Sequence, residues 1–280
     1  MARIQFGTLS IPSCPVDKYI EKFFDSGESP EHEIDVKNYD SFAETLKELE
    51  NGELDLLAMP AEFLHGKQLE MYNANCEVLG ARAPRTPNMI LVSENKIKYQ
   101  PRSAIILSDS KLIRRQLRRA RKGLRVLSTK AFIEIENIKA NFNDELEKYS
   151  WWEELRLNEN IDGYVIPRAI YSEVNINGRR HSLLPDPHNL GDSHYLPQPY
   201  SDLVVIIGRR NFPKSIAQLF TEVEGDTIWK IQDYFLGSMD EKQLESIGIL
   251  VRHRKLSTLM IQAEKHKDLI MEQSFHDLEG

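Results

Sequence analysis

Short apolar runs alternate with amphipathic stretches along the first 210 residues, and this alternation constrains the fold more than any other feature of the chain. Residues 2–6, 33–36 and 54–59 have the pattern of strands, whereas residues 16–24 and 41–50 carry apolar side chains at helical spacing. The order strand, helix, strand, helix, strand is typical of an α/β layer with a mostly parallel sheet. We therefore predict an α/β fold for this part of the chain.

A second series of strand-like and helix-like segments follows, and a helical region closes the chain. The predicted strands are residues 77–81, 89–93, 104–107, 124–127, 163–166 and 203–207, and the predicted helices are residues 111–123 and 132–146. Residues 179–199 are rich in Pro, His, Asn and Asp, which predicts a long loop or crossover. Beyond residue 208, helices are predicted over residues 216–220, 226–235 and 240–271.

Length and composition exclude several classes of protein. A chain of 280 residues with 41% apolar residues is long enough for two domains with cores of their own. No apolar run approaches the ~20 residues that span a bilayer, so we expect no membrane insertion. The opening residues, MARIQFGTLS, contain no apolar signal core, which predicts a cytoplasmic location. The net charge of −7 argues against a general nucleic-acid binder.

The sharpest local feature is the basic helix predicted from residue 111, which follows a strand and a serine-containing turn. Residues 111–125 include eight basic residues and no acidic one. The first amides of a helix lack intrahelical partners and carry partial positive charge. Nearby hydroxyl groups and arginines would complete a pocket for a carboxylate or phosphate. The pattern predicts an anionic small molecule as ligand, with contacts from Ser108, Ser110, Arg114, Arg115 and Arg118.

Other interpretations of this basic helix stay open at the level of the sequence. Its arginines also fit a solvated basic face, a docking surface for an acidic partner, or a nucleic-acid contact. Few aromatic residues lie near the arginines, which disfavours the binding of single-stranded nucleic acid. Asp109 would place a negative charge where the anion binds, unless this residue serves as the N-cap of the helix.

Six short motifs occur in the order in which one enzyme family has them. Residues 6–8 (Phe-Gly-Thr) resemble an Ile-Gly-Thr opening, and residues 80–87 are similar to a Leu-Pro-Arg-x-x-Pro segment. Residues 108–116 resemble a serine turn followed by a Leu-Arg-Arg-Gln helix start, with its paired arginines at Arg114 and Arg115. The other three motifs are residues 46–55, 162–166 and 196–209. Over about its first 210 residues, the chain thus resembles the porphobilinogen deaminase (hydroxymethylbilane synthase) family.

This resemblance implies two periplasmic-binding-like (type II) α/β lobes around a cleft, followed by a third region. It assigns residues 1–97 with 196–210 to the first lobe, residues 98–195 to the second, and residues 211–280 to a helical C-terminal segment. The family links four porphobilinogen units into a linear tetrapyrrole. A carboxylate moves the protons, arginines hold the acetate and propionate groups, and a dipyrromethane primer hangs from a cysteine. The opening motif adds Thr8 to the expected ligand contacts.

The chain departs from the family at the catalytic positions. Residues 59–63 (Met-Pro-Ala-Glu-Phe) stand where the family has His-Ser-x-Lys-Asp, so the lysine is absent and Glu62 is the surviving acid. Residues 128–132 lack the glycine and arginines of the matching family segment. No cysteine follows residue 210, and Cys14 and Cys76 both fall in the first lobe. We therefore expect no dipyrromethane primer and predict no other cofactor.

These observations predict a degenerate relative that binds an anionic or polycarboxylate ligand in the interlobe cleft, with a link to tetrapyrrole biosynthesis by resemblance. Whether it is an enzyme stays open, because the Lys-Asp pair and the primer cysteine are missing. One alternative is a scaffold or partner-binding subunit, including a homodimer, that uses the basic helix and the C-terminal helices. Another is a chorismate dehydratase-like enzyme acting on a carboxylated small molecule.

Two further groups of residues are given structural roles. Tyr149, Trp151 and Trp152 are predicted to pack a peripheral helix against its lobe. A second group has metal-ligating side chains, but its spacing fits no metal motif, so we predict a polar surface loop and no metal site. Its members are His181, Asp186, His188, Asp192 and His194.

Overall fold

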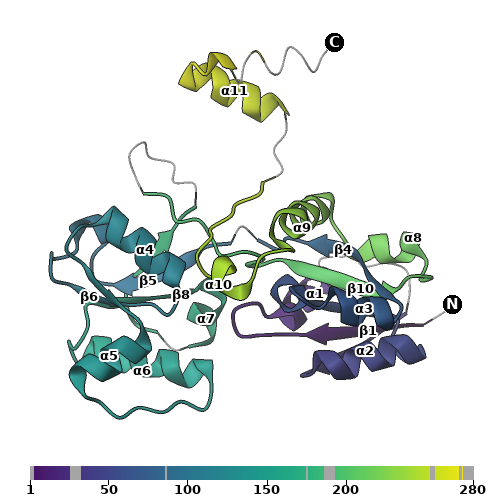
Figure 1. Cartoon of the computed structure of the whole chain (residues 1–280), viewed down its shortest axis with the longest axis horizontal. Helices are drawn as coiled ribbons and strands as arrows, with labels where there is room; N and C mark the ends of the chain where they lie inside the picture. Colours follow the sequence, from purple (N-terminus) through teal and green to yellow (C-terminus); the bar gives the residue numbers. More distant parts are fainter. Residues whose placement is uncertain are drawn as a thin grey trace. The chain divides into compact units, whose positions relative to one another are not determined.

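The computed structural model describes residues 3–25, 33–85, 87–174, 176–185, 193–252, 256–270 and 273. The chain forms two compact units, Met1–Leu250 and Val251–Gly280. The first unit contains two five-stranded sheets, each of which is the centre of one α/β lobe (Figure 1).

The first lobe is built on a sheet with the strand order β2-β1-β3-β10-β4. β1 is parallel to β2 and β3, whereas β10 is antiparallel to β3 and β4. Three helices, α1 (Val16–Asp25), α2 (Phe42–Asn51) and α3 (Gln68–Asn73), follow β1, β2 and β3. The strands are β1 (Ile4–Leu9), β2 (Ile34–Tyr39), β3 (Leu56–Pro60), β4 (Cys76–Arg82) and β10 (Val204–Arg209). The predicted strand–helix alternation at the start of the chain is confirmed.

Both faces of the first sheet are buried, as β10 illustrates. Val204 and Ile206 pack into one apolar cluster with α1, while Val205 and Ile207 pack into another with α2. Successive side chains of a strand point to opposite faces, so a strand covered on both sides needs a continuous apolar run. This explains why the strand predicted over residues 203–207 is the most apolar in the chain.

The second lobe has the strand order β7-β6-β8-β5-β9. β6 is parallel to β7 and β8, whereas β5 is antiparallel to β8 and β9. Helix α4 (Lys111–Ala120) covers one face, and α5 (Thr129–Glu136) and α6 (Glu145–Leu157) cover the other (Figure 1). The strands are β5 (Met89–Ser93), β6 (Ile105–Leu107), β7 (Arg125–Leu127), β8 (Gly163–Pro167) and β9 (Arg180–Leu183).

The chain crosses between the two lobes earlier than the sequence predicts. β5 pairs with β8 and β9, so it belongs to the second sheet, although residues 89–97 are assigned to the first lobe by resemblance. The crossing therefore takes place between β4 and β5, and the return crossing lies between β9 and β10. An ion pair joins the two crossings, with 2.6 Å between Arg85 Nη2 and Asp202 Oδ1.

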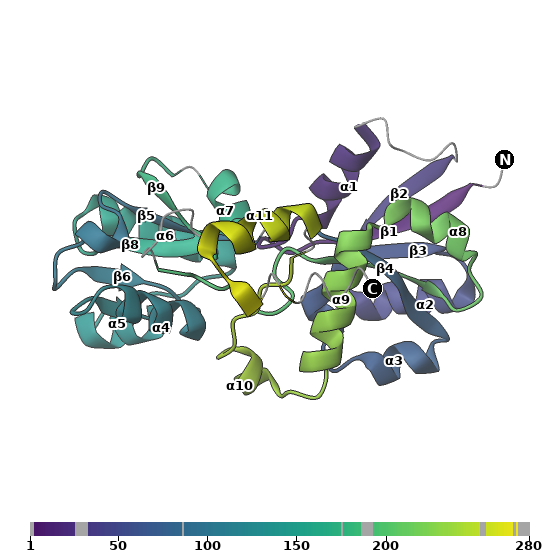
Figure 2. The same ribbon diagram turned by 90° about the horizontal axis from the view of Figure 1, so that it is seen from above.

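The last predicted helix is replaced by shorter ones. Helices α8 (Lys214–Ala217), α9 (Val223–Leu236) and α10 (Glu241–Leu244) belong to the first unit, and α11 (Leu256–His266) belongs to the second. Figure 2 shows α10 as a separate short helix after α9. The single helix predicted over residues 240–271 is therefore wrong, because residues 245–252 are not helical.

Gly248 explains where this long helix is interrupted. A Cβ atom at this position would lie 2.6 Å from the Cβ of Leu196, so only glycine allows this close approach of the two backbones. The neighbouring amide of Ile249 donates a hydrogen bond to the carbonyl of Pro197 at 3.1 Å. Residues 247–250 thus form a segment outside helices and strands that packs along the return crossing.

Other differences from the sequence predictions concern short elements. The helix predicted over residues 132–146 is two helices, because α5 ends before its C-cap Asn137, whose φ is 51°, and α6 begins after its capping residue Asp144. Helix α3, helix α7 (Arg168–Glu173) and strand β9 are not predicted, since six or four residues show no clear period. Residues 186–192 of the predicted loop lie outside the described residues. No helix in the described part of the chain is long and apolar enough to cross a membrane.

Candidate functional site

A cavity of about 350 Å³ lies between the two lobes of the first unit, and we call it the cleft cavity. The second lobe lines most of it, through the turn between β6 and α4 and through one face of α6. Ser13 contributes from the first lobe, and Gln198 contributes from the return crossing. Ligands of open α/β sheets bind beyond the carboxyl ends of strands, and Ser108 directly follows the last residue of β6.

The start of α4 presents free backbone amides beside this cavity. Ser110 is the N-cap: its Oγ accepts from the amide of Ile113 at 3.3 Å, and its carbonyl accepts from the amide of Arg114 at 3.0 Å. The amides of Lys111 and Leu112 have no intrahelical partner by helix geometry. They carry the partial positive charge of a helix start, and Lys111 lines the cavity.

Two buried polar atoms of lining residues have no hydrogen-bond partner among the described residues, namely Ser108 Oγ and Trp152 Nε1. Both residues are only 1% exposed. A buried polar group without a partner costs about 1–3 kcal/mol, so such groups call for an explanation such as a ligand or water. The indole N–H only donates, so the group that completes it is an acceptor.

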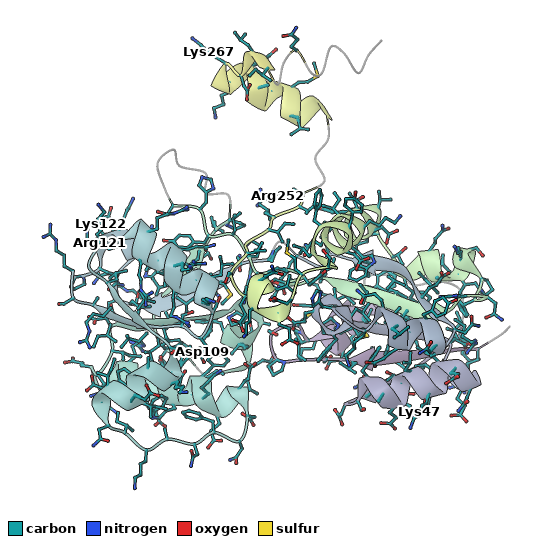
Figure 3. The ribbon with its side chains drawn as sticks, viewed as in Figure 1. Lys47, Asp109, Arg121, Lys122, Arg252 and Lys267 are labelled. Carbon is teal, nitrogen blue, oxygen red and sulfur yellow. The ribbon has the colours of Figure 1, made fainter. Side chains whose placement is uncertain are left out.

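Asp109 is not the N-cap of α4, a role that the sequence leaves open for it. Its carboxylate accepts from the amide of Thr129 at 2.8 Å and from the Thr129 hydroxyl at 2.9 Å. Asp109, which is labelled in Figure 3, also pairs with Lys148, with 3.0 Å between Oδ2 and Nζ. The negative charge is therefore directed to the start of α5 and balanced by Lys148, which also lies 3.6 Å from Glu145.

Two arginines of α4 and the arginine that caps its end donate to backbone carbonyls of their own lobe. Arg114 Nη1 donates to the carbonyls of Ser108 and Asp109 at 2.8 and 2.7 Å, and burial lowers the pKa of this guanidinium group. Arg118 donates to the carbonyl of Val126, and Arg121 donates to the carbonyl of Gln100. These contacts fix the turn before α4 and the flanking loops.

The structure brings together only part of the predicted set of ligand contacts. Ser108, Ser110 and Arg114 line the cleft cavity, while Arg115 and Arg118 lie on exposed positions of α4 and do not line it. Thr8 is buried on β1, where its hydroxyl donates to Asn38 Oδ1 at 2.5 Å, and it does not line the cavity either.

Lys148 and Trp152 are lining residues that the sequence reasoning misses, because the aromatic cluster is assigned to packing alone. Their spacing of four residues places them on one face of a helix. The signal that would identify these two residues is a helix face that carries a lysine and a tryptophan together with Tyr149.

Glu62 lines a second, smaller cavity of about 100 Å³ that shares Ser13, Met89, Pro167 and Gln198 with the cleft cavity. The Glu62 side chain reaches solvent, yet protein surrounds its carboxylate on most sides. This burial raises the pKa of Glu62 to about 7, and the negative charges of Glu145 and Asp202 act in the same direction. A carboxyl group with this pKa gains and loses its proton near neutral pH, as general acid–base chemistry requires.

Neither cysteine fits a covalently attached pyrrole primer. Cys14 lines the Glu62 cavity, but burial raises the pKa of its thiol, with Asp202 and Glu62 adding to the shift. The thiolate is the reactive form of cysteine, so Cys14 is poorly suited to forming a thioether. Cys76 is buried in the first lobe, where its thiol donates to the carbonyl of Ala74 at 3.3 Å.

Nothing in the described ranges forms a group of three or more metal-ligating side chains. Of the predicted polar loop, Asp186, His188 and Asp192 lie outside the described residues. His181 Nε2 lies 3.1 Å from the carbonyl of Ser93, and His194 Nδ1 lies 3.0 Å from the carbonyl of Pro185.

Comparisons with known proteins give distant structural matches. The zinc-bound ligand-binding component of an ABC-type import system from Staphylococcus aureus is 12% identical, with 87% of this chain and 77% of that chain covered and a TM-score of 0.37. A periplasmic substrate-binding protein from Coxiella burnetii is 12% identical, with coverages of 88% and 99% and a TM-score of 0.38. A methionine-bound nutrient-binding protein from Burkholderia cenocepacia is 12% identical, with coverages of 84% and 95% and a TM-score of 0.40. No protein-family model matches the chain, and no curated protein matches it.

The chain has a two-lobed α/β fold with one mixed five-stranded sheet in each lobe. The two mixed five-stranded sheets confirm the fold class that the sequence predicts. Likeness at this level of identity concerns the fold alone. Membership of the porphobilinogen deaminase family stays a prediction.

Proposed function

We propose that the chain binds a small anionic molecule in the cleft cavity, with an acceptor group of the ligand seated at the start of α4. The observation that carries this proposal is the pair of buried, unpartnered donors, Ser108 Oγ and Trp152 Nε1, in the wall of that cavity. The free amides at the start of α4 add donors on the same side.

The preference for an anion rests on donors rather than on net charge. Lys111, Arg114 and Lys148 line the cleft cavity together with three acids, Asp109, Glu145 and Glu245, so the charges balance. Asp109 is already engaged by Thr129 and Lys148. The donors of described lining residues that remain unengaged include a hydroxyl, an indole N–H and two backbone amides, and a carboxylate accepts hydrogen bonds from all of these.

Within this class we propose a polycarboxylate of the porphobilinogen type as the ligand, on the resemblance to the deaminase family. Glu62, with a pKa raised to about 7, is the acid that would move protons if any catalysis survives. The missing lysine and the poor fit of both cysteines to a primer support binding without chain growth.

The test is a calorimetric titration of the full chain with porphobilinogen, repeated with Ser108→Ala and with the control Ser103→Ala, which replaces an exposed serine. We expect binding to weaken about tenfold in Ser108→Ala, because one hydrogen bond to a charged group is lost, and to stay unchanged in Ser103→Ala. Binding that Ser108→Ala leaves unaltered would contradict the assigned site.

A parallel incubation tests catalysis itself. Purified chain is mixed with porphobilinogen, the products are oxidised, and porphyrin fluorescence is compared with a blank without protein. Fluorescence at the level of the blank is the result expected of a binding protein. A signal above the blank would establish an enzyme and make Glu62 the first residue to replace.

We also propose that the C-terminal unit binds a second copy of the chain. Ile270 is 85% exposed, and Ile261 and Leu269 are exposed as well, so this unit carries apolar surface that association would bury. Light scattering of the full chain and of a chain ending at Leu250 tests this. A dimer in the first case and a monomer in the second is expected, whereas equal masses would contradict it.

A further inference from the structure

The first unit contains a cavity that is larger than the cleft cavity. A separate cavity of about 490 Å³ shares no lining residue with the cleft cavity or with the Glu62 cavity. Its walls come from α1, from the crossing after β4, and from α7 in the second lobe. Four of its lining residues are cations: Lys22, Arg82, Arg85 and Arg168. We call this space the cationic cavity.

Two of these cations are held in fixed positions. The Arg82 guanidinium lies 4.1 Å from the centre of the Phe23 ring and forms an ion pair with Glu222 at 2.5 Å. The Arg85 guanidinium lies 5.5 Å from the centre of the Tyr19 ring and pairs with Asp202 at 2.6 Å. A guanidinium held by a ring and a carboxylate loses little freedom when it binds a ligand, and its unused N–H groups remain donors.

The other two cations form no ion pair within the described ranges. Lys22 on α1 and Arg168 at the start of α7 are exposed, and neither has a hydrogen bond or an ion pair among the described residues. They come from different lobes, since α1 belongs to the first and α7 to the second. An anion in the cationic cavity would therefore be contacted by both lobes at once.

We propose that the cationic cavity is a second binding site, for a diphosphate group. The four cations, set against Glu222 in the lining and Asp202 paired with Arg85, leave two positive charges, which matches the charge density of linked phosphates better than that of one carboxylate. The rings of Tyr19 and Phe23 are already in contact with Arg85 and Arg82. Because these rings are occupied, we expect the site to recognise the charged group of the ligand rather than a base or ring. That group is shared by free pyrophosphate and by nucleoside diphosphates.

The test is a calorimetric titration of the full chain with pyrophosphate, with ADP and citrate as separate arms. The variants are a double substitution, Lys22→Ala with Arg168→Ala, and a control, Lys47→Ala, which replaces an exposed lysine of α2 (Figure 3). Unfolding midpoints identify any variant that is destabilised, although exposed, unpaired side chains usually tolerate such changes.

We expect one pyrophosphate per chain, binding that weakens at least tenfold in the double variant, and no change in Lys47→Ala or Ser108→Ala. Tighter binding of ADP would support the same site with a nucleoside source of the diphosphate. The proposal is overturned if the unsubstituted chain does not bind pyrophosphate or if the double variant binds it equally well. It is also overturned if citrate binds as tightly as pyrophosphate and the double variant weakens citrate binding to the same extent. Because Ser108→Ala affects only the cleft cavity, failure here is separate from failure of the proposed function.

Discussion

At the scale of single residues, two serines separated by one position have opposite roles. Ser110 caps α4 and accepts a hydrogen bond, whereas the hydroxyl of Ser108 is buried without a partner. An N-cap stabilises the fold, while an unpartnered buried hydroxyl destabilises it. A destabilising group retained beside a cavity indicates a binding role rather than a structural one.

The two serines therefore predict different changes in stability for the same substitution. Ser110→Ala should lower the free energy of unfolding by about 1 kcal/mol, because the cap is lost. Ser108→Ala should leave that free energy unchanged or raise it by up to about 1 kcal/mol, because a desolvated hydroxyl is removed. Urea unfolding measures both. A large loss of stability in Ser108→Ala would mean that its hydroxyl has a partner in the folded protein.

Glu62 predicts a pH dependence of stability with a definite sign. Its pKa in the folded chain is about 7, above its ordinary value of 4.5, so the folded state favours the protonated form. The stability due to this proton is complete below pH 4.5 and is lost as the pH rises through 7. Glu62→Gln keeps a neutral side chain at every pH. Its unfolding free energy should match that of the original chain at pH 4 and exceed it at pH 8, and a difference that does not vary with pH would contradict this pKa.

At the scale of elements, the arginines in and directly after α4 have different roles: some hold backbone carbonyls in place, and others are exposed to solvent. Arg121 donates to the carbonyl of Gln100 from Nε at 3.2 Å and from Nη2 at 2.9 Å, whereas Arg115 is exposed and has no partner within the described ranges. The spacing of the arginines cannot separate these roles, because both residues fit a solvated face.

The two arginines give a matched pair of substitutions. Arg121→Ala should lower the free energy of unfolding by about 1.5 kcal/mol, since a charged donor to a backbone carbonyl is removed. Arg115→Ala should change it by less than about 0.5 kcal/mol. Denaturant unfolding of both variants decides the matter, and equal effects would argue against a structural role of Arg121.

The sequence predicts strongly apolar strands well and the limits of helices poorly. The limits of β5 are predicted to the residue, and β10 is identified from its apolar run. Asn137 and Gly248 interrupt helices for reasons of backbone conformation and close approach that residue spacing does not reveal. For the candidate site, Ser108 and Ser110 follow from the strand–turn–helix pattern. Trp152 does not, because its contact with the cavity depends on how α6 packs.

At the scale of the whole molecule, the junction between the lobes depends on the ion pair of Arg85 and Asp202. These residues lie on the two crossings, and the side chain of Asp202 is only 7% exposed. Burial raises the pKa of Asp202, while Arg85 opposes the shift. Removing one partner of a buried ion pair leaves the other charge uncompensated, which costs more than the pair contributes.

Asp202→Asn should therefore lower the free energy of unfolding by about 2 kcal/mol. This loss is smaller than for a fully buried ion pair, because the Arg85 side chain is partly exposed. The control is Asp35→Asn, which breaks an exposed ion pair with Arg3 and should change stability by less than about 0.5 kcal/mol. Thermal or urea unfolding of both variants provides the comparison. Equal, small effects would show that the crossings do not depend on this pair.

The measurement that tests the central claim most directly is a crystal structure of the full chain soaked with selenate, an anion whose anomalous scattering locates it unambiguously. The account predicts an anomalous peak in the cleft cavity, within hydrogen-bonding distance of Ser108 Oγ and the amide of Lys111. Loss of this peak in Ser108→Ala would link it to the hydroxyl. Ordered anions elsewhere on the molecule with none at the start of α4 would contradict the claim that the cleft cavity binds an anion.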